Sequence, residues 1–182
     1  MKYHLKTVAA LFIAGVMAAT VAMADARGEL DHRARETLDQ FYSLHHGNHD
    51  LADRAAGVLV FPRVTKGGLG VGGEHGDGVL FVNGKVDGYY NVSSASLGLT
   101  AGIARHSEVV LFMDHHALDR FRDSHDWSIG ADTDVAVVHS GAGGAYDSAT
   151  LNKPILAFMF GEHGLIGDVS LAGSKITQAH PR

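Results

Sequence analysis

Cysteine is absent from this chain of 182 residues. Disulfide bonds, thiolate metal sites, thiol nucleophiles and attachment of lipid through cysteine are therefore all excluded. Small exported domains often depend on disulfides for stability. If this protein is exported, its stability has to come from its apolar core.

The N-terminal region lacks an apolar segment long enough to cross a bilayer. The uncharged segment Val8–Val21 has about 14 residues, whereas a transmembrane helix needs about 20. It follows Lys2 and Lys6 and precedes Ala22-Met23-Ala24, which is the order of a secretory signal peptide. We predict that residues 1–24 are a cleaved signal and that the protein is periplasmic or secreted.

The chain also lacks an excess of positive charge. It has 15 Lys and Arg against 20 Asp and Glu, a net charge of −5. Loss of Lys2 and Lys6 with the signal leaves 13 basic residues against 20 acidic ones, a net charge of −7. This balance argues against nucleic acid as a partner. Binding to an anionic membrane would require a local basic patch.

Sequence signatures of enzymes are lacking as well. Gly68-x-Gly70-x-x-Gly73 has the spacing of a dinucleotide-binding loop, but the pattern predicts a strand after it where that motif needs a helix. The phosphate-binding pattern G-x-x-x-x-G-K-[ST] is missing, and Ser140 has no nucleophile elbow around it. We predict a protein that is not an enzyme and needs no cofactor.

The N-terminal part of the predicted mature domain, residues 27–56, is expected to be helical. Apolar residues spaced by three and four indicate an amphipathic helix from Arg27 to Leu44, which Gly47 and Asn48 end; Asp50 then begins a short helix. The apolar stripe either docks on a sheet or lies in a membrane interface. The residues that would face the membrane in the second case are Leu30, Leu38 and Phe41.

The rest of the chain, residues 57–178, is expected to be rich in β-structure. Short apolar segments alternate with turn signals, and Asn83-Gly84 between two of them predicts a tight hairpin. Asp114 is expected to cap a helix that buries Ala117, Leu118 and Phe121. The predicted class is α+β and mostly β. We expect about eight or more short antiparallel strands in a strongly curled or barrel-like sheet, with two to three helices, in a single domain from 25 to 182.

Several motifs follow one another in order along the chain. They are Gly57-Val58-Leu59-Val60-Phe61-Pro62, Lys66-Gly67-Gly68, Gly70-Val71-Gly72-Gly73, Ser94-Ala95-Ser96, Ser107-Glu108-Val109-Val110-Leu111-Phe112-Met113, Trp127 with Gly130-Ala131-Asp132, Phe160-Gly161 and Val169-Ser170-Leu171 with Lys175-Ile176-Thr177. Together these motifs resemble the SYLF-domain family of lipid-binding modules. The resemblance implies binding of phospholipid, reported as phosphoinositide in eukaryotic members, and no catalysis. Some members bind actin, which an exported protein is not expected to meet.

Basic residues beside the glycine-rich segment are the candidate lipid ligands. Cations together with bare glycine N–H groups can hold a lipid phosphate. The candidates are Arg63, Lys66, Gly67, Gly68, Lys85 and Lys175. Each of these cations could instead be an ordinary solvated surface charge.

We therefore predict a non-enzymatic module of the bacterial envelope that binds anionic phospholipid headgroups. An envelope module that is structural or binds another protein is the alternative. Metal binding by histidine is a minor alternative, because Gly47 and Asn48 interrupt the helix between His45 and His49. Glu74, His75, Glu162 and His163 could form a site only if two similar turns meet. We predict no metal site.

Overall fold

The computed structural model describes residues 25–124, 126–129, 134–138, 146, 148–161, 164–165 and 173–179. The predicted signal peptide and the segment Glu162–His163 lie outside these residues. Within them, no helix is long and apolar enough to cross a membrane.

Two very long strands form the centre of the fold. β1 (Gly57–Val82) pairs with β2 (Lys85–Phe112) along its whole length as one antiparallel hairpin. Asn83 and Gly84 close it with φ of 50° and 72°, the two positive angles that a type I′ turn requires. The predicted hairpin is confirmed, but strands expected to be short and separate are continuous.

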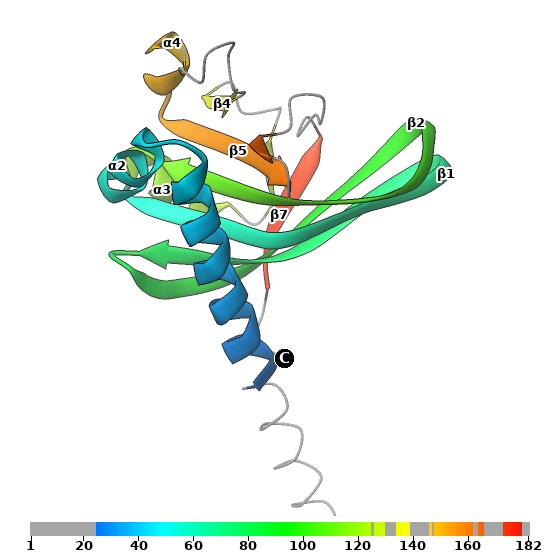
Figure 1. Ribbon diagram of the computed structural model, residues 1–182, viewed down its shortest axis with the longest axis horizontal. Helices are drawn as coiled ribbons and strands as arrows, with labels where there is room; N and C mark the ends of the chain where they lie inside the picture. Colours follow the sequence, from blue (N-terminus) through cyan, green and yellow to red (C-terminus); the bar gives the residue numbers. More distant parts are fainter. Residues whose placement is uncertain are drawn as a thin grey trace, which may run out of the picture.

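The hairpin bends back on itself, so that its two halves lie against each other (Figure 1). We call this bend the fold-back. It coincides with a shift of register between Leu69 and Val71. Residues 57–68 with 102–112 form one half, and residues 72–82 with 85–96 form the other. The first half pairs with β5 (Ile155–Gly161), and the second pairs with β7 (Ser174–Gln178).

The remaining strands extend this curled sheet at both sides. β3 (Trp127–Ile129) pairs with β7, whereas β4 (Val135–Val138) and β6 (Gly164–Leu165) pair with β5. The result is a barrel-like, mostly β fold, as the sequence predicted. The expectation of a purely antiparallel sheet is wrong for β4 and β5, which are parallel. Residues 139–154 separate these two strands, which is enough chain for a crossover.

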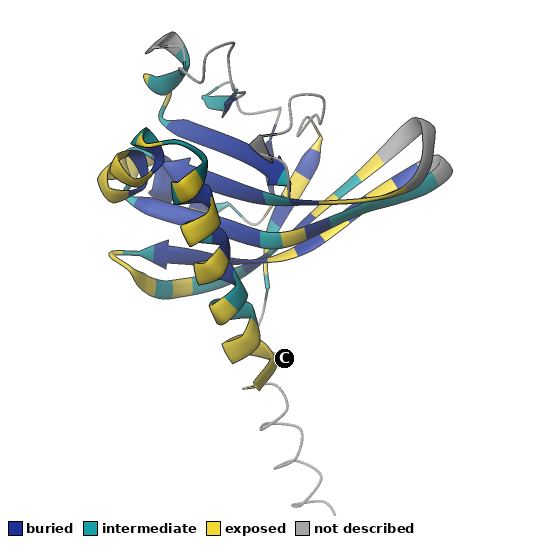
Figure 2. Ribbon diagram, viewed as in Figure 1, coloured by how far each residue is buried: buried dark blue, intermediate teal, exposed yellow. Residues whose placement is uncertain are grey.

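Alternating side chains of the hairpin build two apolar cores. Leu59, Phe61, Val110 and Phe112 point inside the curled sheet, where α3 (His115–Asp123) and Trp127 pack on them. Val58, Val60, Val109 and Leu111 point to the other face. The first helix (residues 25–44) and α2 (Gly47–Arg54) cover that face (Figures 1 and 2). Ala117, Leu118 and Phe121 are buried and Asp114 caps α3 by accepting a hydrogen bond from Ala117 N at 2.7 Å, as predicted.

The first helix docks on the sheet through its apolar stripe. Ala34 and Phe41 are fully buried, and Leu30 and Leu38 are half-buried against the same core. The alternative interpretation, with Phe41 facing a membrane, is therefore wrong for this fold.

Gly47 and Asn48 were expected to end the first helix, but they begin α2. Asn48 is buried, and its side-chain nitrogen donates to the carbonyl of Phe41 at 2.8 Å. Its side-chain oxygen accepts from the Tyr146 hydroxyl at 2.7 Å. These two bonds let a polar residue sit inside the fold and join the end of the first helix to α2. The short helix α4 (Ser148–Leu151) precedes β5.

Glycine allows the two halves of β1 to approach closely. A Cβ on Gly78 would overlap with the ring of Phe61 and lie 2.9 Å from the Val60 carbonyl oxygen. We expect Gly78→Ala to lower the free energy of unfolding by about 1–3 kcal/mol, the usual cost of overpacking a core. Urea denaturation of the purified protein would measure it.

Gly28→Ala is the matched control for this prediction. A Cβ on Gly28 would have no atom within 4 Å, and the residue lies in the first helix. Because alanine favours a helix over glycine by up to about 1 kcal/mol, this variant should be as stable as the wild type or more so. Equal stability of the two variants would contradict the proposed role of Gly78.

Candidate functional site: a basic pocket at the fold-back

A small pocket opens where the first helix crosses the two halves of β1. Its volume is about 230 Å³. The lining residues are Leu30, Arg33, Pro62, Arg63, Thr65, His75, Gly76 and Asp77. A Cβ on Gly76 would lie 2.8 Å from the Arg63 carbonyl oxygen, so the missing side chain is what lets the two halves meet here. The fold-back thus brings together residues that are distant in sequence.

Two arginines supply the positive charge of this pocket. Arg63 is exposed and forms no ion pair with any residue that the structure describes. Arg33 lies 3.6 Å from Glu29 through one terminal nitrogen, but its buried Nε has no hydrogen-bond partner among the described residues. Asp77 reduces the charge; it lies 3.7 Å from His75 and accepts a hydrogen bond from Asn91. The pocket therefore offers donors that an oxyanion could use.

Further cations lie around the pocket on the same outer side of the sheet. Arg105 is the direct cross-strand neighbour of Thr65, and Lys175 lies in one row with Ser93 and His75. Side chains of cross-strand neighbours project from the same face of a sheet. We call Arg33, Arg63, Arg105 and Lys175 the basic face.

An exposed apolar side chain accompanies the basic face. Ile103 is 75% exposed, and it is the one large hydrophobic residue among the described residues that is exposed to solvent. It lies two residues from Arg105 on β2 and so shares its face. Cations beside a protruding apolar side chain are the combination that a phospholipid surface can engage.

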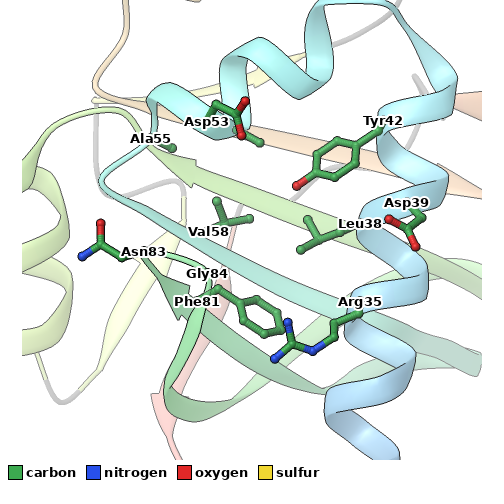
Figure 3. A pocket seen from close by; sticks show the side chains of 11 residues that line it. Arg35, Leu38, Asp39, Tyr42, Asp53, Ala55, Val58, Phe81, Asn83 and Gly84 are labelled. Atoms are coloured by element: carbon green, nitrogen blue, oxygen red, sulfur yellow. The ribbon is translucent and has the colours of Figure 1, made fainter.

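A larger cavity of about 540 Å³ lies between the first helix, α2 and the tip of the hairpin (Figure 3). Arg35 lies over the ring of Phe81, with its guanidinium carbon 5.1 Å from the ring centre. Asp39 and Asp53 also line the cavity, and burial together with these two carboxylates raises the pKa of Tyr42. Two acids against one arginine make this cavity a poor site for an anion.

A third cluster lies inside the curled sheet. Glu74 from the second half of the hairpin meets His106 and Glu108 from the first half. His106 Nε2 lies 2.8 Å from Glu108 Oε1 and 3.5 Å from Glu74 Oε1. Ser94 donates a hydrogen bond to Glu74 Oε2 at 3.2 Å. The side chains of His106, Glu74 and Glu108 are only 3%, 2% and 0% exposed. We call these three residues the buried triad.

Comparison with known proteins indicates the family to which part of the chain is similar. The family model described as "Ysc84: Las17-binding protein actin regulator" matches residues 93–181, while no curated protein matches the chain. Residues 93–181, just under half of the chain, thus match the SYLF-domain family. The family is one of binding modules.

The matched part of the chain begins within β2 and extends beyond β7. It contains Arg105, Lys175 and two members of the buried triad. β1, which carries Arg63 and Glu74, lies outside the match but pairs with β2 along its entire length. Both the basic face and the buried triad therefore join matched and unmatched parts of one structure.

The fold brings only some of the predicted lipid ligands together. Arg63 lines the basic pocket and Lys175 lies on the same side of the sheet, whereas Lys66 is not part of the lining. Gly67 and Gly68 pair with Ile103 and Gly102 in the sheet, so their backbones are engaged in the β1–β2 ladder. Lys85 lies at the hairpin tip, away from the fold-back. Arg33, Arg105 and Ile103 were missed by the sequence interpretation.

The pKa values of the buried triad reflect one cation between two carboxylates. Burial opposes the charged imidazolium, but the hydrogen bonds and charges of Glu108 and Glu74 outweigh it and raise the pKa of His106 to about 9. Burial also raises the pKa of Glu108, and the charge of Glu74 adds to this effect. For Glu74 burial is outweighed by the hydrogen bond and charge of His106, and its pKa is lowered.

The clustered histidines of the protein have separate partners. His49 lies 3.0 Å from Asp53, and His45 Nδ1 accepts a hydrogen bond from Gly47 N at 3.1 Å. Among the described residues, the potential metal ligands whose donor atoms all lie within 4.8 Å of one another are those of the buried triad. The spacing His106-x-Glu108 on one strand face could have suggested this cluster. The expectation of short, separate strands hid it, because His106 and Glu108 share a face only if one strand runs through both residues.

Proposed function

We propose that this protein is a non-enzymatic module that binds anionic phospholipid headgroups through the basic face. The observation that carries the proposal is the basic pocket, where Arg63 has no ion-pair partner among the described residues and Arg33 has a buried, unpaired Nε. Charge-assisted hydrogen bonds from arginine to phosphate are among the strongest that proteins form.

The size of the pocket fits a headgroup better than a whole lipid. Its volume of about 230 Å³ lies below the roughly 300–1,000 Å³ of pockets that enclose drug-sized ligands. The acyl chains would therefore stay in the bilayer while the phosphate enters the pocket. Ile103, beside Arg105, would then insert among the headgroups.

The proposal also extends to location. A signal peptide at residues 1–24 would deliver the domain to the periplasm or the exterior, where it would associate peripherally with a membrane. The net charge of −7 without Lys2 and Lys6 would repel an anionic surface if the charges were spread evenly. The gathering of cations on the basic face provides the local attraction that such a surface needs.

Arg63→Glu is expected to weaken binding to anionic membranes. Each cation near such a surface contributes about 1 kcal/mol, so reversal of one charge should cost about 2 kcal/mol, or about 30-fold in affinity. The measurement is flotation with phosphatidylcholine liposomes that contain increasing fractions of phosphatidylglycerol. Wild-type binding should rise with the anionic fraction and fall with added salt, because salt screens exposed charges.

Arg54→Glu is the matched control, because it makes the same change in charge elsewhere. Arg54 is exposed at the end of α2 and forms no ion pair with the residues that the structure describes. Its reversal should leave the affinity within a few-fold of wild type. Equal losses in both variants would mean that only net charge matters and would refute a defined site. Absence of wild-type binding under every condition would favour a module that binds another protein.

A further inference from the structure

The buried triad is costly to maintain if it serves only as a structural element. Moving charged groups out of water carries a penalty of several kcal/mol per ion unless geometry and hydrogen bonds compensate fully. Here compensation is incomplete. Glu108 Oε2 is buried without a hydrogen-bond partner among the described residues, and Glu74 Oε1 has only the long contact of 3.5 Å with His106 Nε2. Buried oxygens of this kind call for a partner.

The donor atoms are the types that bind a transition metal. The triad offers one imidazole nitrogen and two carboxylate groups, a donor set found for Zn²⁺ and related divalent ions. Ligands placed about 2.0–2.2 Å from a tetrahedral ion lie about 3.3–3.6 Å from each other. The contacts of 2.8 and 3.5 Å around His106 Nε2 come close to this, so small side-chain movements would admit an ion.

The charges of the site also balance with a metal. A metal ion that binds His106 Nε2 would replace the proton held there and release it to solvent. The two carboxylates and the neutral imidazole then carry a charge of −2, which a divalent ion cancels inside the low-dielectric core. No lysine or arginine side chain pairs with Glu74 or Glu108 among the described residues. A divalent cation would therefore satisfy the charge and the unpaired oxygens at the same time.

We propose that Glu74, His106 and Glu108 form a binding site for a divalent transition-metal ion such as Zn²⁺. The three ligands come from both halves of the folded hairpin, so an ion held by them would fasten the fold-back beneath the basic face. This proposal is independent of lipid binding, because its ligands point inside the sheet and the basic face points outside.

Calorimetric titration of the purified protein with Zn²⁺ tests the site, after treatment with chelator and its removal. We expect one ion per chain and a rise in Tm on binding. Visible d–d absorption of bound Co²⁺ should show a ligand field with nitrogen and oxygen donors.

Glu108→Gln and Glu74→Gln keep the shape of the side chain but remove its charge. Each is expected to weaken binding more than about 100-fold, beyond the 10–100-fold typical of groups that only support a ligand.

Surface histidines need their own control. The variant His45→Gln/His46→Gln/His49→Gln removes the cluster near α2 and should retain the Zn²⁺-dependent rise in Tm in full. Circular dichroism without metal establishes that the glutamine variants are folded. The proposal is overturned if wild-type protein binds no Zn²⁺, or if binding disappears in the surface-histidine variant and persists in Glu108→Gln and Glu74→Gln.

Discussion

Replacement of His106 by leucine is expected to lower the free energy of unfolding at pH 7 by about 3–5 kcal/mol in the presence of chelator, the cost of removing one partner of a buried ion pair. The side chain is only 3% exposed and lies 2.8 Å from Glu108 and 3.5 Å from Glu74. Its loss leaves two carboxylates in the core without a cation. Denaturation by urea, followed by circular dichroism, measures the change.

The pH dependence of the same measurement follows from the raised pKa of His106. Its pKa is about 9 in the folded protein, against about 6.5 for an unperturbed histidine. The stabilisation from this group is complete below the unfolded pKa and is lost as pH rises through the folded one. Wild-type stability should therefore decline between about pH 6.5 and pH 9. The raised pKa of Glu108 acts in the same direction.

A variant with all three positions made apolar is the control for His106→Leu. Apolar groups of similar volume often replace a buried ionic cluster without loss of stability. Glu74→Leu/His106→Leu/Glu108→Met should therefore be more stable than His106→Leu alone and should lack the decline above pH 6.5. A loss below 1 kcal/mol in His106→Leu, or an unchanged pH profile, would contradict the buried ionic contacts.

Local signals in the sequence predicted local structure well. Asn83-Gly84 predicted the hairpin because only a few residue types adopt two successive positive φ angles. Asp114 predicted the start of α3 because its carboxylate can accept from the free N–H groups of the first turn. Val58, Leu59 and Val60 belong to one of the short apolar segments that were expected to form strands, and this segment contributes side chains to both cores.

The fold-back could not be predicted in this way. Nothing in the pattern around Leu69 and Val71 states that two strands will bend together and bring residue 76 against residue 63. Gly76 and Gly78 indicated that another segment could pack closely against the backbone at these positions. The sequence does not indicate which segment that is. The basic pocket and the buried triad both depend on this bend. Arg63 could therefore be selected, while its partners Arg33 and Arg105 could not.

Whether the first helix docks on the sheet or lies in a membrane interface is decided by the packing of the fold and cannot be predicted from the sequence of the helix alone. A stripe of Leu30, Leu38 and Phe41 suits a membrane interface as well as a protein core. The sheet already has an apolar face formed by Val60, Val109 and neighbouring side chains. Docking of the helix on this face buries both surfaces at once. In the function proposed above, the membrane contact therefore falls to the sheet and its cations.

Phe41→Ala should lower the free energy of unfolding by about 3–5 kcal/mol, the range for truncation of a fully buried phenylalanine. Phe41 is fully buried, and its ring meets Phe158 edge-on with the ring centres 4.8 Å apart. Phe160 lies on the same side, with its ring centre 6.1 Å away. Loss of the ring would leave a cavity between the helix and β5. Urea denaturation measures the effect, and the milder Phe41→Leu serves if the alanine variant does not fold.

Flotation of the same variant separates the two roles considered for the helix. If the first helix leaves the sheet to enter membranes, weaker packing of the helix on the sheet would favour its dissociation. Phe41→Ala or Phe41→Leu would then bind liposomes more tightly than the wild type. If the helix is a structural element and the basic face contacts the lipid, the folded variant should bind as the wild type does. Arg63→Glu should show the opposite pattern, with unchanged stability and weakened binding, because its side chain is exposed and unpaired among the described residues. Tighter binding by the Phe41 variants would indicate that the first helix inserts into the membrane, and it would contradict lipid binding through the basic face.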